Sequence, residues 1–380
     1  MRPGRQTRQR LTSIAHRGLA LRELFDETER VVRSVVGFDG CCWLTLDPAT
    51  YLPTSHVAHG SIRAADVPKL ARNEIVEDDV NKFAELARAR RHAATLSEAT
   101  GGVPERSPRY RDLLRPSDFE SELRAAFVDG PSAWGGIAMY RRSGNADFTA
   151  PERTLVASVS GVVAEGIRRA LLLTAARATE GQGDLGLILL EPGGASETTS
   201  PAARRWLDQM ITPPAGPGEL PNVVHAVAYR ALLAARSGAE EISRSRVPME
   251  GGGWIVLHGT VIGDPDRGRT AVILEPAHRY DLAPLIVEAY GLTARERQVV
   301  QLVLQGRTTN EIAAALHISP YTAQDHLKAI FDKVEVRSRR ELVAQVFFQH
   351  YAPQLSDGAS LDASGWFAPR VGQVVERIPG

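Results

Sequence analysis

The spacing of apolar residues divides the first part of the chain into helical and extended segments. From Leu11 to Val36 apolar side chains recur every three or four residues, which predicts one long amphipathic helix. Residues 66–100 are expected to be largely helical, and Phe148 begins a long apolar helix that reaches about Ala176. Strands are predicted where apolar runs end in turn residues, at 41–47, 51–59, 123–127 and 135–141. This order predicts an α+β fold for residues 11–176.

A second region, residues 185–277, has a similar mixture of elements. The pattern opens with a strand at 185–191, and helices follow from Ser200 through Met210 and over 222–235. Three antiparallel strands separated by glycine-rich or Asp-Pro turns complete it, at 243–249, 254–262 and 269–275. Residues 177–184 contain Gly181-Gln182-Gly183 and are interpreted as a linker. We therefore predict a second α+β domain.

Helix signals are densest between Leu292 and Phe347. Three Ser/Thr-x-x-Glu boxes can satisfy the free amides of a helix start: Thr293 with Glu296, Thr308 with Glu311, and Ser338 with Glu341. Ser319 followed by Pro320 marks a fourth start, because proline lacks only an N–H that the first turn leaves unpaired. Four short helices are therefore predicted, after a connector at 278–291.

The third of these helices has two different faces. Its apolar stripe falls at Ala323, Leu327, Ile330, Phe331 and Val334. The opposite face carries Tyr321, Gln324, Asp325 and Lys328. The preceding helix points Ile312, Ala313 and Leu316 toward the same core, and His317-Ile318-Ser319 is a short connector. This pattern is typical of a helix-turn-helix, in which the second helix enters the major groove of DNA.

The same residues resemble the DNA-binding domain of the LuxR-type (GerE-like) regulators. The family pattern of LTxRE, G-x-x-N-x-EIA, S-x-x-T-x-x-x-H and SR-x-EL is matched at Leu292–Glu296, Gly306–Ala313, Ser319–His326 and Ser338–Leu342. The resemblance implies that the third helix contacts DNA, and that the fourth carries a dimer contact. We assign DNA contacts to Thr308, Thr309, Tyr321, Thr322, Gln324, Asp325 and Lys328. We assign the dimer contact to Leu342, Val343, Val346 and Phe347.

Three positions depart from the usual family pattern. Gln324 stands where lysine is frequent, and Asp325 where a neutral residue is frequent. Glutamine suits the N6/N7 edge of adenine, whereas an acidic side chain accepts from cytosine N4 or rejects other bases. Glu335 replaces a glycine that usually follows the third helix. The base preference of relatives therefore does not transfer to this chain.

The two preceding regions resemble known sensor folds. Residues 11–176 resemble a GAF domain, most clearly at Glu122–Arg124, Trp134–Arg141 and Phe148–Arg153. Residues 185–277 resemble a PAS domain with a shortened helical part. The fold class is therefore multidomain: an α+β GAF-like domain, an α+β PAS-like domain and an all-α four-helix LuxR-type domain. In the first domain, Cys42, Trp43, Trp134 and Tyr140 are candidates for a ligand pocket, with core packing as the alternative.

Composition adds limits to this picture. Forty-five basic and forty-five acidic residues give a formal net charge of zero, so DNA affinity has to come from a local patch and from two domains on one palindrome. Residues 1–10 are basic and are interpreted as a solvated arm, with phosphate contact as the alternative. Apolar side chains continue into the tail at 348–380, which is expected to dock on another domain or subunit. No long apolar span or signal peptide is seen, so we expect a cytoplasmic protein.

The sequence offers little sign of catalysis or metal binding. Adjacent Cys41 and Cys42 point to opposite faces of a strand, which favours a core role over oxidant sensing or binding of a thiophilic metal. His56 and His59 lack further clustered ligands, and Gly251-Gly252-Gly253 is a turn rather than a phosphate loop. We therefore expect no metal, no cofactor and no enzymatic activity.

Taken together, the patterns predict a homodimeric regulator of transcription that binds a palindromic operator in double-stranded DNA. A small-molecule effector bound by the N-terminal domains is expected to control it. Two alternatives remain open at this point: an output regulator driven by a partner protein or kinase, with the N-terminal folds as dimer scaffolds, and an enzyme with a regulatory helix-turn-helix.

Overall fold

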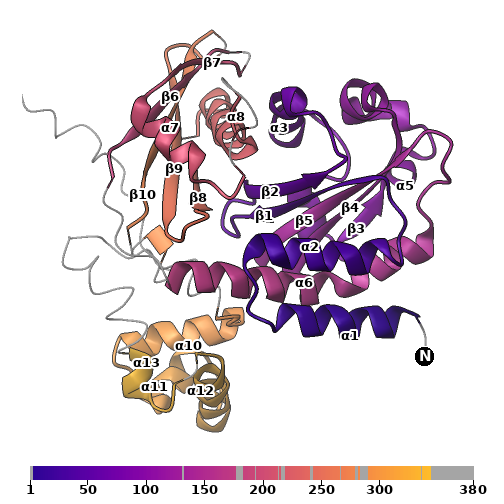
Figure 1. Ribbon diagram of the computed structural model, residues 1–380. Coiled ribbons are helices and arrows are strands. Elements are labelled where there is room, and N and C mark those ends of the chain that lie inside the picture. Colours follow the sequence, from indigo (N-terminus) through magenta and orange to yellow (C-terminus); the bar gives the residue numbers. More distant parts are fainter. Residues whose placement is uncertain are drawn as a thin grey trace, which may run out of the picture. The chain divides into compact units, whose positions relative to one another are not determined.

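The computed structural model describes residues 3–130, 132–176, 183–192, 194–212, 214, 219–239, 243–265, 267–278, 281–282, 290–334 and 336–343. The chain divides into two compact units, Met1–Ala277 and His278–Gly380. The first unit contains two five-stranded sheets, and the described part of the second unit is helical (Figure 1). Among the described residues, no helix is both long enough and apolar enough to cross a membrane.

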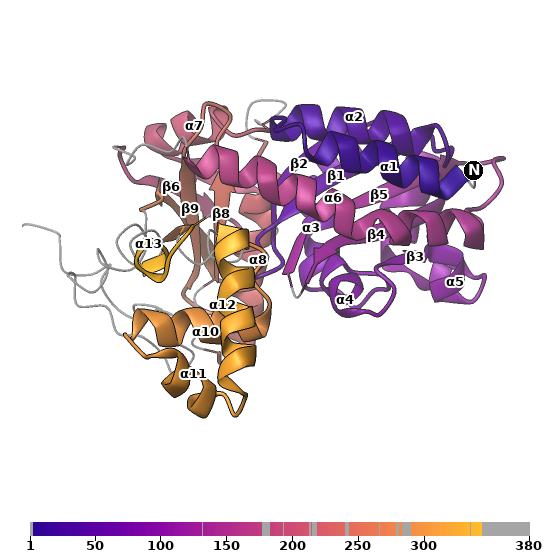
Figure 2. The same cartoon turned by 90° about the horizontal axis from the view of Figure 1, so that it is seen from below.

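The first sheet has the order β2-β1-β5-β4-β3, and every neighbouring pair is antiparallel. Its strands are β1 (Gly40–Leu46), β2 (Pro53–His59), β3 (Ala93–Thr95), β4 (Phe119–Asp129) and β5 (Ser132–Arg142). Helices α1 (Pro3–Ala15), α2 (Leu21–Arg33) and α6 (Ala150–Ala176) lie together along one side of it (Figure 2). Short helices surround the opposite side: α3 (Val67–Ile75), α4 (Phe83–Arg88) and α5 (Leu96–Thr100).

The second sheet has the order β7-β6-β10-β9-β8 and is also antiparallel. Its elements are β6 (Gly186–Leu190), β7 (Ser196–Thr199), β8 (Ser243–Pro248), β9 (Trp254–Ile262) and β10 (Arg269–Pro276), with helices α7 (Pro201–Asp208) and α8 (Asn222–Ser237). Helix α8 packs on strands β8, β9 and β10, so its apolar residues Val223, Val224 and Val227 close the core of this lobe.

The two sheet lobes share a buried boundary. Leu52, which precedes β2, belongs to the apolar core beneath α8, and Ile75 of α3 packs against that core. An ion pair crosses the same boundary, because Arg246 Nε of β8 lies 3.2 Å from Asp47 Oδ2 and both side chains are almost completely buried. Burying two charges is favourable only when they are well paired. The lobes therefore form one packed body, Met1–Ala277.

In its described residues the second unit has helices α10 (Ala294–Leu304), α11 (Thr309–Ala315), α12 (Pro320–Val334) and α13 (Arg339–Val343). They close around one apolar core that includes Val299, Ile312, Ile330 and Leu342. Lys333 of α12 donates to both carboxylate oxygens of Glu296 in α10, at 2.9 and 2.7 Å. Position 335, where glutamate replaces the usual glycine, lies outside the described residues.

Most predicted elements are confirmed, and the N-terminal helix is corrected. Residues 3–10 form the start of α1 instead of a solvated arm, because Thr7, Leu11 and Ile14 make a buried stripe one helical turn apart. The predicted single helix from Leu11 to Val36 is two helices. Gly18 separates them with a φ of +67°, a left-handed conformation that glycine adopts readily. Residues 66–100 are less helical than predicted, and include β3.

Candidate functional site

A tight connection joins α11 to α12. His317 adopts a left-handed backbone with φ of 53°, and the Ile318 amide returns to the carbonyl oxygen of Ala313 at 3.0 Å. Ser319 then caps α12, because its hydroxyl accepts from the Thr322 amide at 3.0 Å. The predicted helix–turn–helix connection is therefore present, with the turn at 316–319.

Two of the three predicted capping boxes are complete, and the third is half formed. The amides of Glu296, Glu311 and Glu341 donate to the hydroxyls of Thr293, Thr308 and Ser338 at 3.2, 3.3 and 3.1 Å. In the first two boxes the glutamate returns the bond to the threonine amide, at 2.6 and 2.7 Å. In the third, the Glu341 carboxylate instead accepts from the Arg337 amide at 2.8 Å. These local bonds fix where each helix begins, as the sequence spacing indicates.

Helix α12 buries one side and exposes the other. Ala323, Leu327, Ile330 and Val334 are each 7% exposed or less. Tyr321 is 78% exposed, and Gln324, Asp325 and Lys328 are also on the surface. None of these four side chains makes a hydrogen bond or ion pair with another described residue. A side of α12 with unengaged polar and aromatic groups is therefore available to a partner.

The three predicted threonines are in a different situation. Thr308 is exposed, but its hydroxyl donates to Glu311 Oε2 at 2.8 Å. Thr322 is half-buried, and its hydroxyl lies 2.8 Å from that of Ser319. Thr309 is half-buried in the first turn of α11. For Thr308 and Thr322 the cap already uses the hydroxyl, so Gln324, Asp325 and Lys328 are better placed to contact a partner.

The predicted dimer contact is corrected at one position. Leu342 is fully buried among Val299, Ile330 and other residues of its own helical core, so it is not available to a second copy. Val343 is half-buried and packs against the same core. Val346 and Phe347 lie outside the described residues.

The four predicted pocket residues do not surround one cavity. Trp43 stacks on Phe25 of α2 and on Phe127, with ring centroids 5.6 Å apart in both pairs, on the side of the sheet that the long helices cover. Cys42 and Tyr140 face the opposite side, because neighbouring strand residues alternate. Tyr140 stacks on Phe119 at 4.9 Å, and Trp134 is 1% exposed. Core packing explains these aromatic residues.

Ionic groups fill the side of the sheet that Cys42 and Tyr140 face. Arg109 is 1% exposed and forms a bidentate ion pair with Glu122 of β4, with its Nη2 atom 2.8 Å from Oε2. Its backbone amide donates to Asp79 Oδ2 at 2.8 Å. Burial raises the pKa of Asp79, but the Arg109 charge and three hydrogen bonds outweigh this and hold the pKa below its ordinary value. The predicted ligand site is thus occupied by the protein's own ion network.

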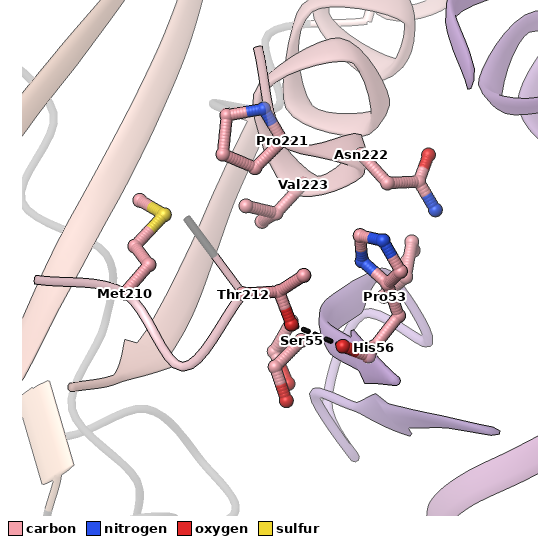
Figure 3. Close-up of a pocket in the computed structure, with 9 residues that line it drawn as sticks. Pro53, Ser55, His56, Met210, Thr212, Pro221, Asn222 and Val223 are labelled. Carbon is pink, nitrogen blue, oxygen red and sulfur yellow. Dashed lines mark hydrogen bonds between the residues drawn. The ribbon is translucent and has the colours of Figure 1, made fainter. Parts of the chain in front are cut away.

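A small pocket lies where the two lobes meet (Figure 3). His56 and Asn222 flank it, and the Thr212 hydroxyl donates to the His56 carbonyl oxygen. Burial lowers the pKa of His56, so the imidazole is neutral near pH 7. The pocket volume of about 10 Å³ is close to the minimum for one water molecule. An organic effector therefore does not fit here.

A larger cavity of about 40 Å³ opens between α3, α8 and the ends of β6 and β10. Its inner wall includes Leu190, Tyr229 and His225, while Arg72 and Arg236 stand at the rim. His225 is 3% exposed, and its Nδ1 atom has no hydrogen-bond partner. Burial lowers the pKa of His225 to about 4, so the buried ring is neutral. Sequence reasoning missed this site because its residues come from positions far apart in the chain.

Comparison with known proteins identifies the helical unit. Residues 291–346 match the family model of "Bacterial regulatory proteins, luxR family". The spore germination protein GerE of Bacillus subtilis is 40% identical over 55 residues, which are 14% of this chain and 74% of that protein. A putative HTH-type transcriptional regulator of Aeromonas salmonicida is 48% identical over 59 residues, or 16% of this chain. The chain spans only 30% of the length of that regulator.

The similarity to solved structures is weak. The GAF domain of a phosphoenolpyruvate-protein phosphotransferase from Coxiella burnetii has a TM-score of 0.32 and 14% sequence identity. The match covers 45% of this chain and 95% of that domain.

Proposed function

Because the chain belongs to the LuxR family of bacterial regulatory proteins through its residues 291–346, we propose that it is a transcription regulator that binds double-stranded DNA through α12. One observation carries the proposal: Tyr321, Gln324, Asp325 and Lys328 share the exposed side of a helix whose other side is buried. A recognition helix has this division, because it packs on its own domain and presents polar side chains to base edges.

The side chains of α12 suit different parts of DNA. Gln324 can make a bidentate contact with adenine N6 and N7, and Asp325 can accept from cytosine N4. Lys328 is one turn further along the same side and suits a phosphate or guanine. Asp325 also repels phosphate, so it favours a close fit to the correct site over non-specific binding. The proposed interface is therefore selective but weak in a single copy.

Dimerisation on a palindromic operator follows from this weakness. The whole chain has no net charge, and among the described cations of the helical unit Lys333 is paired with Glu296. Two helical units on one operator bind far more tightly than one, because the second contact is intramolecular. We propose a homodimer whose interface is formed by residues other than the buried Leu342.

Signal control is assigned to the first unit, whose lobes we interpret as GAF-like and PAS-like. We assign the contact with the effector to the mouth of the cavity lined by His225, Tyr229, Arg72 and Arg236, whose interior of about 40 Å³ admits only a small polar group of the ligand. A neutral imidazole with a free Nδ1 atom suits a ligand hydroxyl or amide, and the rim arginines suit an anionic group. An effector of this kind changes DNA affinity only if it prefers one arrangement of the two units.

The experiment is a selection of binding sites from a random pool of DNA duplexes by the full chain, followed by affinity measurements on the enriched sequence. We expect enrichment of an inverted repeat. Native mass spectrometry of the complex should show two chains per duplex. No enrichment over an unrelated bead-bound protein would contradict the DNA-binding proposal. One chain per duplex would contradict only the dimer.

A further inference from the structure

Three metal-ligating side chains from three separate elements meet beside α2. They are Glu29 of α2, Cys41 of β1 and His59 of β2. Cys41 Sγ lies 3.2 Å and His59 Nδ1 2.8 Å from the same carboxylate oxygen, Glu29 Oε2. One ligand atom from each residue lies within 4.8 Å of those of the other two. A carboxylate, a thiol and an imidazole thus converge on one point.

Regular secondary structure fixes this arrangement. Cys41 and His59 are directly opposite each other in the antiparallel pair of β1 and β2, so their side chains share one face of the sheet. Helix α2 crosses that face, where Phe25 stacks on Trp43. Glu29 follows Phe25 by four residues and so lies on the same side of α2. The three donors are therefore held by rigid elements rather than by loops.

The carboxylate is oriented from outside the cluster. Arg33 donates to Glu29 Oε1 at 2.8 and 3.3 Å, which leaves the other oxygen facing Cys41 and His59. Trp43 Nε1 donates to Oε2 at 3.1 Å. Three groups that can donate a hydrogen bond therefore surround Oε2, although a single oxygen has only two lone pairs to accept them. A cation between Cys41 and His59 would replace two of these crowded contacts.

The separations are close to those of a tetrahedral site. With metal bonds of about 2.0 Å to oxygen and nitrogen and about 2.3 Å to sulfur, tetrahedral ligands stand ~3.3–3.6 Å apart. The distances to Glu29 Oε2 are 2.8 and 3.2 Å. Relative to Glu29 Oε2, the sulfur and the nitrogen therefore have to move outward by about 0.5 Å or less. The separation between Cys41 Sγ and His59 Nδ1 is within 4.8 Å, so these two atoms can close on the same ion from either side. The His59 side chain is 47% exposed, which provides a path for entry and room for a water ligand.

We propose that Glu29, Cys41 and His59 bind one divalent cation of the zinc class, with water as the fourth ligand. The cation replaces the thiol proton of Cys41, which passes to solvent, and it binds Nδ1 of His59 in the neutral tautomer that carries its proton on Nε2; a proton on Nδ1 in the metal-free protein passes to Nε2 through solvent. Mixed sulfur, nitrogen and oxygen ligands favour Zn²⁺ over Mg²⁺ or Ca²⁺. Arg33, whose Nη2 atom is 4.0 Å from Cys41 Sγ, further stabilises the thiolate. The bound metal would tie α2 to β1 and β2.

This assignment revises the expectation of no metal site. In the sequence, Cys41 is next to Cys42 and His59 is close to His56, so each pair looks like two ligands for one metal. On a strand, however, the two side chains of each pair point to opposite faces. The partner that completes the site, Glu29, is twelve residues before Cys41 on another element. Metal binding at this cluster is independent of the proposed DNA binding by α12.

The test is a Co²⁺ titration of the full chain, freed of tags and metals, followed by absorbance. We expect one equivalent to produce a thiolate-to-cobalt band in the near ultraviolet and the visible bands of tetrahedral Co²⁺, and Zn²⁺ to abolish both. Cys41→Ser should remove the near-ultraviolet band. Loss of a residue that only orients a metal ligand weakens metal binding by roughly 10- to 100-fold. Because His59 is itself a ligand, His59→Gln should weaken Co²⁺ binding by at least this much.

Cys42→Ser is the matched control, because Cys42 is adjacent but faces the other side of the sheet. It should bind Co²⁺ like the wild type. His59 is exposed, so His59→Gln keeps the test valid if changes at buried Glu29 or Cys41 prevent folding. Absence of the thiolate band in the folded wild type would overturn the proposal, as would an undiminished band in Cys41→Ser.

Discussion

The ammonium group of Lys333 lies 2.9 and 2.7 Å from the two carboxylate oxygens of Glu296 and joins the end of α12 to the start of α10. Glu296 also accepts from the Thr293 amide at 2.6 Å. Burial raises the pKa of Glu296, but these partners outweigh it and hold the pKa below its ordinary value. One carboxylate therefore combines a helix cap with a tie between two helices.

Lys333→Met should destabilise the helical unit by about 1 kcal/mol at pH 7, since Lys333 is partly exposed and solvent weakens the pair. Because the folded pKa of Glu296 is lowered, the stabilisation is complete above the unfolded pKa of about 4.3 and is lost as the pH falls through the folded value. Hydrogen exchange of α10 and α12 peptides measures this. A difference between variant and wild type that stays constant from pH 7 to pH 3 would contradict the assignment.

The buried pair of Asp47 and Arg246 predicts a larger effect in the first unit. Asp47→Ala leaves the Arg246 guanidinium buried without its partner, and breaking a buried pair in this way costs about 3–5 kcal/mol. Urea unfolding followed by tryptophan fluorescence should show a lower midpoint. Asp118→Ala is the control, because its pair with Arg142 is exposed on both sides. Equal effects of the two substitutions would show that the inter-lobe pair is unimportant.

The buried, neutral His225 should make the stability of the first unit sensitive to acid. Its folded pKa of about 4 lies below the unfolded value of about 6.5, so the unfolded chain takes up a proton first as the pH falls. Stability should therefore be complete above about pH 6.5 and decline down to about pH 4, by a few kcal/mol at about 1.4 kcal/mol per pKa unit. His225→Leu should flatten this part of the stability profile, whereas the exposed His16→Leu should leave it unchanged. Identical profiles for His225→Leu and wild type would refute this role.

Shortening the Leu342 side chain should destabilise the helical unit itself, and not only its dimerisation. It is completely buried in the helical core, so Leu342→Ala should cost about 2–5 kcal/mol of stability in that unit. The half-buried Val343→Ala should cost less. Hydrogen exchange reports the local stability, and sedimentation reports the subunit count. A Leu342→Ala protein that keeps full protection but becomes monomeric would restore Leu342 to the dimer contact.

Most of the helical unit could be predicted from the sequence because its signals are local. Caps such as Thr308 with Glu311, and the stripe from Ala323 to Val334, depend on residues three or four positions apart, so the sequence contains the whole interaction. The break at Gly18 was not predictable in this way, because the flanking apolar spacing continues through it. Strand β7 has only four residues, too few for a clear alternation.

Sites built from distant residues were harder to predict. Trp43 and Tyr140 look alike as candidate pocket residues, and only strand register reveals that they face opposite layers. Arg109 fills the expected pocket by pairing with Glu122, which no local pattern indicates. The cavity beside His225 requires α3 and α8 to pack together from two different lobes. Tertiary packing, rather than any sequence motif, decides these three sites.

The most direct test of the account is the salt dependence of binding between the full chain and its selected operator, compared for wild type and Lys328→Ala. If Lys328 meets phosphate, the variant should bind more weakly and the slope of log affinity against log salt should fall by roughly one unit for each subunit bound. Lys69→Ala, on α3 of the first unit, is the matched control and should bind like wild type. Unchanged affinity of Lys328→Ala at every salt concentration would remove this side of α12 from the DNA interface.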